Sequence, residues 1–284
     1  VASPTAPFVS PDRSMVAPKL GIIAGGGTLP VRLANACQEG GRDFLLLALE
    51  GHAEADIVAS VPHEWIRPGA GGKTIKRLRE EGVEELVLVG PVRRPSLKEI
   101  RPDGWGIKFL ARIGRAWASD NSFFSALVSA LEEEGFKVVG ADSILSDCVS
   151  VAGPYGRVTP NDETLQDIER GLAVVRKLGE LDIGQAAVVQ QGVVLGVEGV
   201  EGTDSLIERC AALQCSGVGG VLVKARKPQQ ERRVDLPTIG RSTVEKAIAG
   251  NLSGIAIEAG GALVFDREEF VRLADEANIF VVGV

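Results

Sequence analysis

Short apolar runs alternate with longer segments of helical periodicity along almost the whole chain, and this alternation limits the folds that the chain can adopt. In the first half, strands are expected at 19–24, 44–49 and 86–89, with helical segments between them. Buried strands that alternate with helices are typical of a parallel sheet with helices packed on its faces. The sequence therefore predicts an α/β protein.

Turn-forming residues gather at 153–162 and divide the chain into two parts. Before them we expect an N-terminal Rossmann-like domain over 19–150, with a parallel sheet. After a linker over 151–164 we expect a C-terminal mixed α/β domain over 165–284, which begins with a helix and then a β-hairpin around Gln191-Gly192. Residues 1–18 are expected to be a flexible leader outside both domains.

Composition narrows the class of protein. The chain has 284 residues, of which 45% are hydrophobic, so it can bury substantial cores. Its formal net charge of −7 argues against a general nucleic-acid binder, because binding to a phosphate backbone draws on a basic surface. No nucleic-acid partner is therefore expected, and any anionic ligand must be held by a local cluster of cations.

The few histidines and the spacing of the cysteines limit the kinds of catalytic site and the cellular compartment that we expect. Only His52 and His63 are present, which disfavours a histidine-rich dimetal centre and a Ser-His-Asp triad. The four cysteines form no CxxC pair, and no run of about 18 apolar residues occurs. We therefore expect a cytoplasmic protein with reduced thiols and at most peripheral contact with a membrane.

The segment 224–240 carries the densest charge in the chain. It is expected to be a loop between a buried strand at 218–223 and a helix at 243–250, and loops held by rigid elements often carry sites. Its basic side chains could hold phosphate oxygens, whereas Glu231 and Asp235 could bind a divalent cation or activate water. A solvated surface loop is the structural alternative. The basic residues of this segment are Lys224, Arg226, Lys227, Arg232 and Arg233.

Two further segments invite a functional interpretation. Gly25, Gly26 and Gly27, followed by Thr28, lie between a strand and a helix, where free backbone N–H groups can bind an anion. With Glu50 as a ribose-binding acid, this turn also fits weakly with a dinucleotide site, although a plain tight turn accounts for it equally well.

The segment 197–204 gathers three carboxylates, Glu198, Glu201 and Asp204, ahead of a helix that carries Arg209. The carboxylates could bind Mg²⁺. The structural alternative is that Thr203 or Asp204 only caps the helix and that Glu198 pairs with a lysine.

Five motifs in register over about 220 residues resemble one family, the LpxI-type UDP-2,3-diacylglucosamine pyrophosphatases of lipid A biosynthesis. The motifs are Leu20-Gly-Ile-Ile-Ala-Gly-Gly-Gly-Thr-Leu-Pro30, Gly90-Pro-Val-Arg-Arg-Pro95, Leu181-Asp-Ile-Gly-Gln185, Val197-Glu-Gly-Val-Glu-Gly-Thr-Asp204, and the charged segment 224–240 through Leu236-Pro-Thr-Ile-Gly240. Glu231 departs from the pattern, which carries Asp at that place. Ala225 is an apolar residue among cations.

The resemblance implies a cytoplasmic enzyme that hydrolyses UDP-2,3-diacylglucosamine with Mg²⁺. A homodimer and peripheral contact with the inner membrane are further expectations. UMP and 2,3-diacylglucosamine 1-phosphate would be its products. We expect Asp235, Lys224 and Arg233 to be catalytic, and Asp235, Asp204 and Glu201 to bind the metal. The substrate-binding set is expected to be Gly25, Gly26, Gly27, Thr28, Gln185, Thr203, Arg209, Lys227 and Gln230.

The acyl chains of such a substrate would need an apolar chamber, which we expect between the domains. The alternatives to the pyrophosphatase are a nicotinamide-dependent oxidoreductase and a nucleotide-binding regulatory module, both of which rest on the glycine turn.

Overall fold

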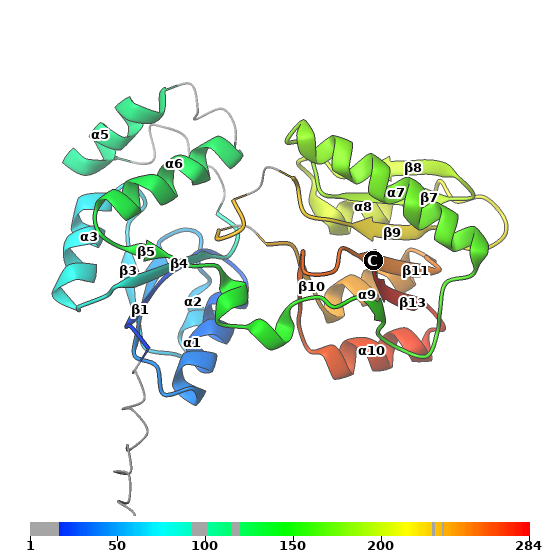
Figure 1. The fold of residues 1–284 in the computed structure, drawn as a ribbon, viewed down its shortest axis with the longest axis horizontal. Coiled ribbons are helices and arrows are strands. Elements are labelled where there is room, and N and C mark those ends of the chain that lie inside the picture. Colours follow the sequence, from blue (N-terminus) through cyan, green and yellow to red (C-terminus); the bar gives the residue numbers. More distant parts are fainter. Residues whose placement is uncertain (1–16, 93–100, 115–119, 229–230, 235) are drawn as a thin grey trace, which may run out of the picture.

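A computed structural model describes residues 17–92, 101–114, 120–228, 231–234 and 236–284. The chain forms an N-terminal and a C-terminal α/β unit that lie side by side (Figure 1). None of the helices in these ranges is long and apolar enough to cross a membrane.

The N-terminal sheet is parallel and has five strands in the order β3-β2-β1-β4-β5. This is a Rossmann-like order, in which the strands are added outward in one direction from β1 to β3 and in the other direction from β4 to β5. The strands are β1 (Leu20–Ala24), β2 (Phe44–Leu49), β3 (His63–Ile66), β4 (Glu85–Val89) and β5 (Lys137–Val138). The expected parallel α/β architecture is confirmed.

Helices cover both faces of this sheet because β1 and β2 are apolar on both faces. Leu20, Ile22 and Leu46 face α1 and α2, whereas Leu47 faces α3 and α6 on the opposite side. The helices are α1 (Leu29–Glu39), α2 (Ala55–Val58), α3 (Gly71–Glu80), α5 (Gly104–Ile113) and α6 (Asp120–Glu133). Two short 3₁₀ turns, η2 (Ala141–Ser143) and η3 (Ser146–Cys148), lead out of the domain.

The C-terminal sheet is mixed and has six strands in the order β6-β13-β11-β9-β7-β8. Its centre, β9, β11 and β13, is parallel, and antiparallel strands flank it on both sides. Its strands are β6 (Gly153–Pro154), β7 (Ala186–Gln190), β8 (Val193–Val197), β9 (Val221–Lys224), β11 (Gly254–Ile257) and β13 (Phe280–Gly283). The expected mixed α/β domain and its hairpin at Gln191-Gly192 are thus confirmed.

One long helix, α7 (Asp162–Glu180), covers one face of this sheet, and three helices cover the other (Figure 1). The three are α8 (Gly202–Ala211), α9 (Arg241–Ala249) and α10 (Arg267–Glu276). Ala225 is buried against Val175 of α7 and Ala187 of β7, which accounts for an apolar residue inside a charged segment.

The sequence expectations differ from the structure mainly at edges and ends. Strand β3 was not predicted, because it lies at the edge of its sheet, where a half-exposed strand needs no apolar run. Part of the segment expected to be a linker forms β6, which pairs with β13. A two-stranded parallel pair, β10 (Thr238–Ile239) with β12 (Leu263–Val264), was also not predicted.

The two domains share a hydrophobic contact. Leu263 and Phe265, from the β12 segment of the C-terminal domain, belong to the cluster of buried residues built around β1, β2 and α1. Val234 and Leu236 of the charged segment pack against the two clusters of the N-terminal domain. The charged segment therefore bridges the domains.

Candidate active site between the two domains

A cavity of about 580 Å³ opens between the two domains. The N-terminal domain contributes Thr28 and Arg32, and all other lining residues come from the C-terminal domain. These are Glu201, Gly202, Thr203, Asp204, Lys224, Thr238, Ile239, Gly240, Arg241, Ser242, Thr243, Phe265 and Asp266. The cavity thereby unites three of the five motifs, which lie up to about 200 residues apart in the chain.

Four helices begin at this cavity. The N-cap residues of α1, α8, α9 and α10 are Thr28, Glu201, Gly240 and Asp266, and all four line the cavity. In the described structure none of the four helices has a side-chain hydrogen bond at its cap. The first N–H groups of a helix have no partner within the helix and carry partial positive charge, so the cavity favours an anion.

Lys224 brings a cation to the cavity from the end of β9. In a strand, alternate side chains share a face, so Lys224 points to the same side as Leu222, toward α8 and α9. Its Nζ donates to Oγ1 of Thr203 at 3.1 Å and to the carbonyl of Thr238 at 3.4 Å. With 7% of its surface exposed, Lys224 is among the few buried charged residues.

Glu198 is the buried counterpart of Lys224. Its Oε1 accepts from the hydroxyl of Thr203 at 2.7 Å, and its Oε2 accepts from the backbone N–H of Gln185 at 2.8 Å. Thr203 thus links the Glu198 carboxylate to the Lys224 ammonium group by two hydrogen bonds. The expectation that Thr203 or Asp204 caps the helix is wrong, because the N-cap residue is Glu201. The helix begins one residue earlier, at Gly202, which has a φ of +81°.

Glu201 and Asp204 lie at the cavity as expected, but Glu201 is already engaged. Its carboxylate accepts from the Arg209 guanidinium at 2.9 Å and from the backbone N–H of Gly199 at 3.1 Å. Its own backbone N–H and Arg209 lower the pKa of Glu201. Arg209 does not line the cavity, and it also donates to the carbonyl of Val197. Its observed contacts hold the start of α8.

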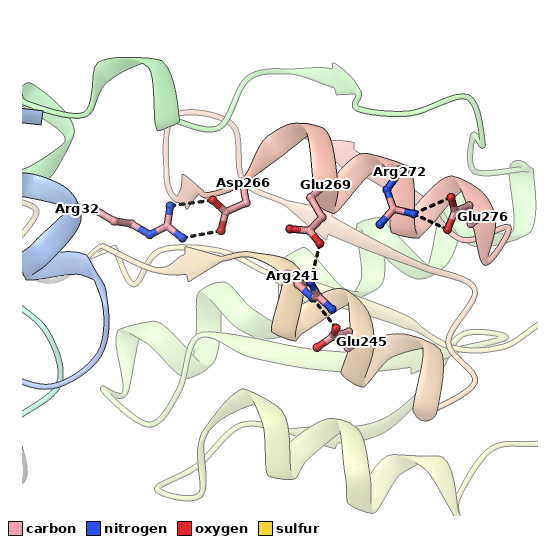
Figure 2. A network of polar contacts seen from close by, with 7 residues as sticks. All are labelled: Arg32, Arg241, Glu245, Asp266, Glu269, Arg272 and Glu276. Atoms are coloured by element: carbon pink, nitrogen blue, oxygen red, sulfur yellow. Dashed lines mark hydrogen bonds and ion pairs between the residues drawn. The ribbon is translucent and has the colours of Figure 1, made fainter. Parts of the chain in front are cut away.

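Two arginines outside the predicted site residues line the cavity from opposite domains. Figure 2 shows both with their carboxylate partners. Arg32 of α1 makes a two-point ion pair with Asp266, with nitrogen-to-oxygen distances of 2.9 and 2.5 Å. Arg241 of α9 pairs with Glu245 at 2.7 Å and with Glu269 at 2.6 Å. The Arg32 hydrogen bond lowers the pKa of Asp266, and the Glu245 hydrogen bond raises the pKa of Arg241.

The glycine turn makes contacts within the protein. The N–H of Gly25 donates to the carbonyl of Val89, and that of Gly26 donates to the carbonyl of Pro91. A side chain at Gly25 would approach the carbonyl of Gly90 to 2.6 Å, so the glycine permits close backbone packing of this turn.

Gly27 completes the turn with a φ of +74°, and its N–H donates to Oε2 of Glu54 at 2.9 Å. A carboxylate of the chain itself therefore occupies the position at which the turn of a dinucleotide-binding protein holds phosphate. Only Thr28, the residue after the turn, reaches the cavity.

Three cations of the charged segment are paired with carboxylates, two of them across the domain boundary. Lys227 contacts Asp182 at 2.8 Å, Arg232 contacts Asp142 at 2.9 Å, and Arg233 contacts Glu132 at 2.6 Å. Arg233 also bonds Glu231, and this hydrogen bond lowers the pKa of the Glu231 carboxyl. Lys227 and Arg233 are not among the cavity-lining residues.

Three other predicted site residues are Gln185, Gln230 and Asp235. Gln185 contacts Glu198 through its backbone N–H, and its side-chain oxygen is buried without a hydrogen-bond partner in the described structure. Asp235 and Gln230 lie outside the described residues. Within the described ranges, no group of three or more His, Cys, Asp or Glu side chains is arranged to hold a metal ion.

Arg32, Arg241, Ser242, Thr243 and Asp266 line the cavity although sequence reasoning missed them. A usable signal existed for Arg241 to Thr243, because they follow Leu236-Pro-Thr-Ile-Gly240 directly and open a helix. No comparable signal marked Arg32 and Asp266, which are 234 residues apart.

Two family models match most of the chain. The model of the LpxI N-terminal domain matches residues 19–148, and that of the LpxI C-terminal domain matches residues 151–282. The chain is 42% identical over 273 residues to the UDP-2,3-diacylglucosamine pyrophosphatase LpxI of Caulobacter vibrioides, covering 94% of this chain and 97% of the relative.

A solved structure, the N5-carboxyaminoimidazole synthetase of Staphylococcus aureus, aligns with 68% of this chain and 43% of its own at a TM-score of 0.24 and 13% identity. The matches to both LpxI domain models and the 42% identity to the relative from Caulobacter vibrioides show that the chain belongs to the LpxI family.

Proposed function

We propose that this protein hydrolyses UDP-2,3-diacylglucosamine to UMP and 2,3-diacylglucosamine 1-phosphate, in the cytoplasm and as part of lipid A biosynthesis. The relative from Caulobacter vibrioides carries the name of this activity over 94% of the chain. The observation that carries the proposal is the cavity itself, where Lys224, Arg32 and Arg241 meet four helix N-termini. A diphosphate is the part of the substrate that such a cavity suits.

Hydrolysis of the diphosphate requires groups that neutralise the negative charge of its phosphates. Water adds to one phosphorus, the bridging phosphorus–oxygen bond breaks, and the bridging oxygen leaves with the other phosphate. The two negative charges of the diphosphate repel the nucleophile, so groups fixed before the reaction lower the barrier. Lys224 is suited to this role because its ammonium group is buried and held by Thr203 and Thr238.

Asp235 is proposed from the sequence as the group that orients or activates the attacking water. It follows the basic residues of the charged segment and precedes Leu236-Pro237, whose restricted backbone limits its freedom. Its neighbours Val234 and Leu236 pack against the N-terminal domain.

Mg²⁺ is proposed as the cofactor. Magnesium is usually bound by one or two carboxylates together with substrate phosphates, and Asp204 is an exposed carboxylate on the cavity wall. Asp204, Glu201 and Asp235 remain the proposed ligands, although Glu201 would have to leave Arg209. When bound, the ion would neutralise phosphate charge.

The acyl chains require a different surface. Ile239 and Phe265 are the only large apolar side chains that the described cavity lining contains, so this cavity suits the headgroup and is not the apolar chamber expected from the sequence. Burial of the chains would still supply most of the lipid affinity, at about 0.8 kcal/mol per methylene. Turnover of UDP-glucosamine as fast as that of the diacylated substrate would contradict this requirement.

The test is release of UMP from UDP-2,3-diacylglucosamine in detergent, with Mg²⁺ and with EDTA. We expect UMP only when the divalent ion is present. Activity that EDTA leaves unchanged would remove Mg²⁺ from the proposal, and absence of UMP would overturn the function.

Hydrolysis in ¹⁸O-labelled water would locate the attacked phosphorus. We expect the label in the sugar 1-phosphate, because the family resemblance favours attack at the phosphate attached to the sugar. Label in UMP would contradict this assignment.

No observation favours the nicotinamide-dependent oxidoreductase. Glu54 bonds Gly27 at the turn on which that alternative rested.

A further inference from the structure

The pair of Arg32 and Asp266 joins the two domains at the cavity wall (Figure 2). Arg32 extends from the first turns of α1, and its guanidinium lies 4.9 Å from the centre of the Phe265 ring. The guanidinium is therefore held in place by stacking as well as by the carboxylate. It presents the planar donor fork that binds carboxylates and phosphates with two hydrogen bonds.

Asp266 is in an unfavourable conformation for its place in the chain. It is the N-cap residue of α10, yet its φ and ψ of 50° and 46° are left-handed, and its side chain makes no cap hydrogen bond. Aspartate is a preferred N-cap residue in the extended conformation, as Asp103 shows at α5, where its carboxylate accepts from the N–H of Gly106. The carboxylate of Asp266 instead bonds Arg32, which leaves the first N–H groups of α10 without a side-chain cap.

The Arg32 pair is also exposed enough to exchange. The two side chains keep 36% and 42% of their surface exposed, and ion pairs with that exposure are weak. A diphosphate carries more charge and more oxygen atoms than one carboxylate, and it would enter a cavity that already favours anions.

We propose that Arg32 binds the diphosphate of the substrate and that Asp266 is the carboxylate that it exchanges for this group. Asp266 is then an internal stand-in for the phosphate, which holds Arg32 in position while the cavity is empty and is released to cap α10 when the ligand binds. The proposal rests on the proposed function, because it concerns the same cavity and substrate.

Binding of UDP, measured by calorimetry, tests the exchange independently of activity. Arg32→Ala should weaken UDP binding roughly tenfold to a hundredfold, and Arg32→Lys should weaken it less, because it keeps the charge and loses the fork. Asp266→Asn should instead tighten binding by about two- to fivefold, because it frees the guanidinium.

The double variant separates exchange from a simple change of local charge. In the Arg32→Ala background, Asp266→Asn should tighten UDP binding less than it does in the wild-type background, because no guanidinium is left to release. The matched control is Arg272→Ala, which removes an exposed α10 ion pair with Glu276 away from the cavity and should leave UDP affinity unchanged.

Two results would overturn the inference. One is equal UDP affinity in Arg32→Ala and wild type, and the other is weaker binding in Asp266→Asn, which would make the pair only a link between the domains. The parallel assay of UMP release by the wild type keeps the two proposals apart. An inactive wild type that binds UDP through Arg32 would refute the function alone, whereas an active wild type with unaffected Arg32→Ala binding would refute the exchange alone.

Discussion

At the scale of single residues, the charged segment has two roles that the sequence does not separate. Lys224 faces the cavity, whereas Arg232 and Arg233 reach carboxylates of the N-terminal domain, Asp142 and Glu132. The observed contacts of these arginines hold the segment against the other domain. Their expected part in substrate binding stays a prediction.

Replacement of Asp235 tests the central catalytic assignment. Asp235→Ala should keep the folded state and lipid binding but lower kcat by roughly a hundredfold to several thousandfold, which corresponds to about 3–5 kcal/mol of transition-state stabilisation. Steady-state kinetics and copurification of lipid measure both effects. Nearly full kcat in this variant, together with loss of activity in Glu201→Ala or Asp204→Ala, would move the assignment to the segment 197–204.

Thiol reactivity tests the burial of individual cysteines. All four cysteines are free, and Cys215 is exposed, whereas burial raises the pKa of Cys37, Cys148 and Cys210. Because the thiolate is the reactive species, one thiol should react rapidly with Ellman's reagent at pH 8, and all four should react after denaturation. Cys215→Ser should abolish the rapid phase, and a rapid phase that persists would contradict the assignment.

At the scale of elements, buried hydrogen bonds fix the start of α8 against β7 and β9. Glu198 accepts from Thr203 and from the N–H of Gln185, and Thr203 accepts from Lys224. Loss of the carboxylate would leave these buried donors without an acceptor. This network therefore sets the cavity wall, although its members are spread over 40 residues.

Glu198→Ala should lower the free energy of unfolding by about 2–4 kcal/mol, because it leaves buried donors and the Lys224 charge uncompensated. Urea denaturation measures the change. The control is Glu208→Ala on α8, whose exposed pair with Lys246 should contribute less than about 1 kcal/mol. Equal losses in the two variants would show that the Glu198 network does not stabilise the fold beyond an ordinary surface pair.

At the scale of the whole molecule, Phe265 couples the two domains. It follows β12 of the C-terminal domain, is 9% exposed, and packs in the core cluster around β1 and α1. Because all three tryptophans lie before residue 150, tryptophan fluorescence reports on the N-terminal domain alone. Circular dichroism reports on both domains.

In the wild type, urea unfolding followed by the two probes should give coincident curves, because the shared core couples the domains. Phe265→Ala should lower stability by about 3 kcal/mol and separate the two curves. Trp65→Ala, at a half-exposed edge position, should leave the curves coincident. Coincident curves in Phe265→Ala would show that other contacts carry the coupling.

The sequence predicted most of the buried strands and part of the residues that line the cavity. Strands such as β1, β2 and β7 are buried and apolar on both faces, so each run of residues shows its strand directly. The edge strand β3 and the two-residue strands β6 and β10 were missed, because their residues carry little local pattern and depend on a partner strand. Thr28, Glu201, Thr203, Asp204 and Lys224 were selected and do meet at the cavity.

The sequence alone determined the alternation of strands and helices, the two α/β domains and the motifs that mark the family, because these depend on local periodicity and on residue identity. Only the tertiary structure decided which motif residues face one another. It placed Glu54 on Gly27 and Arg32 beside Asp266, pairs that lie 27 and 234 residues apart. Such pairings follow from how the sheets and helices pack, and local sequence carries no record of that packing.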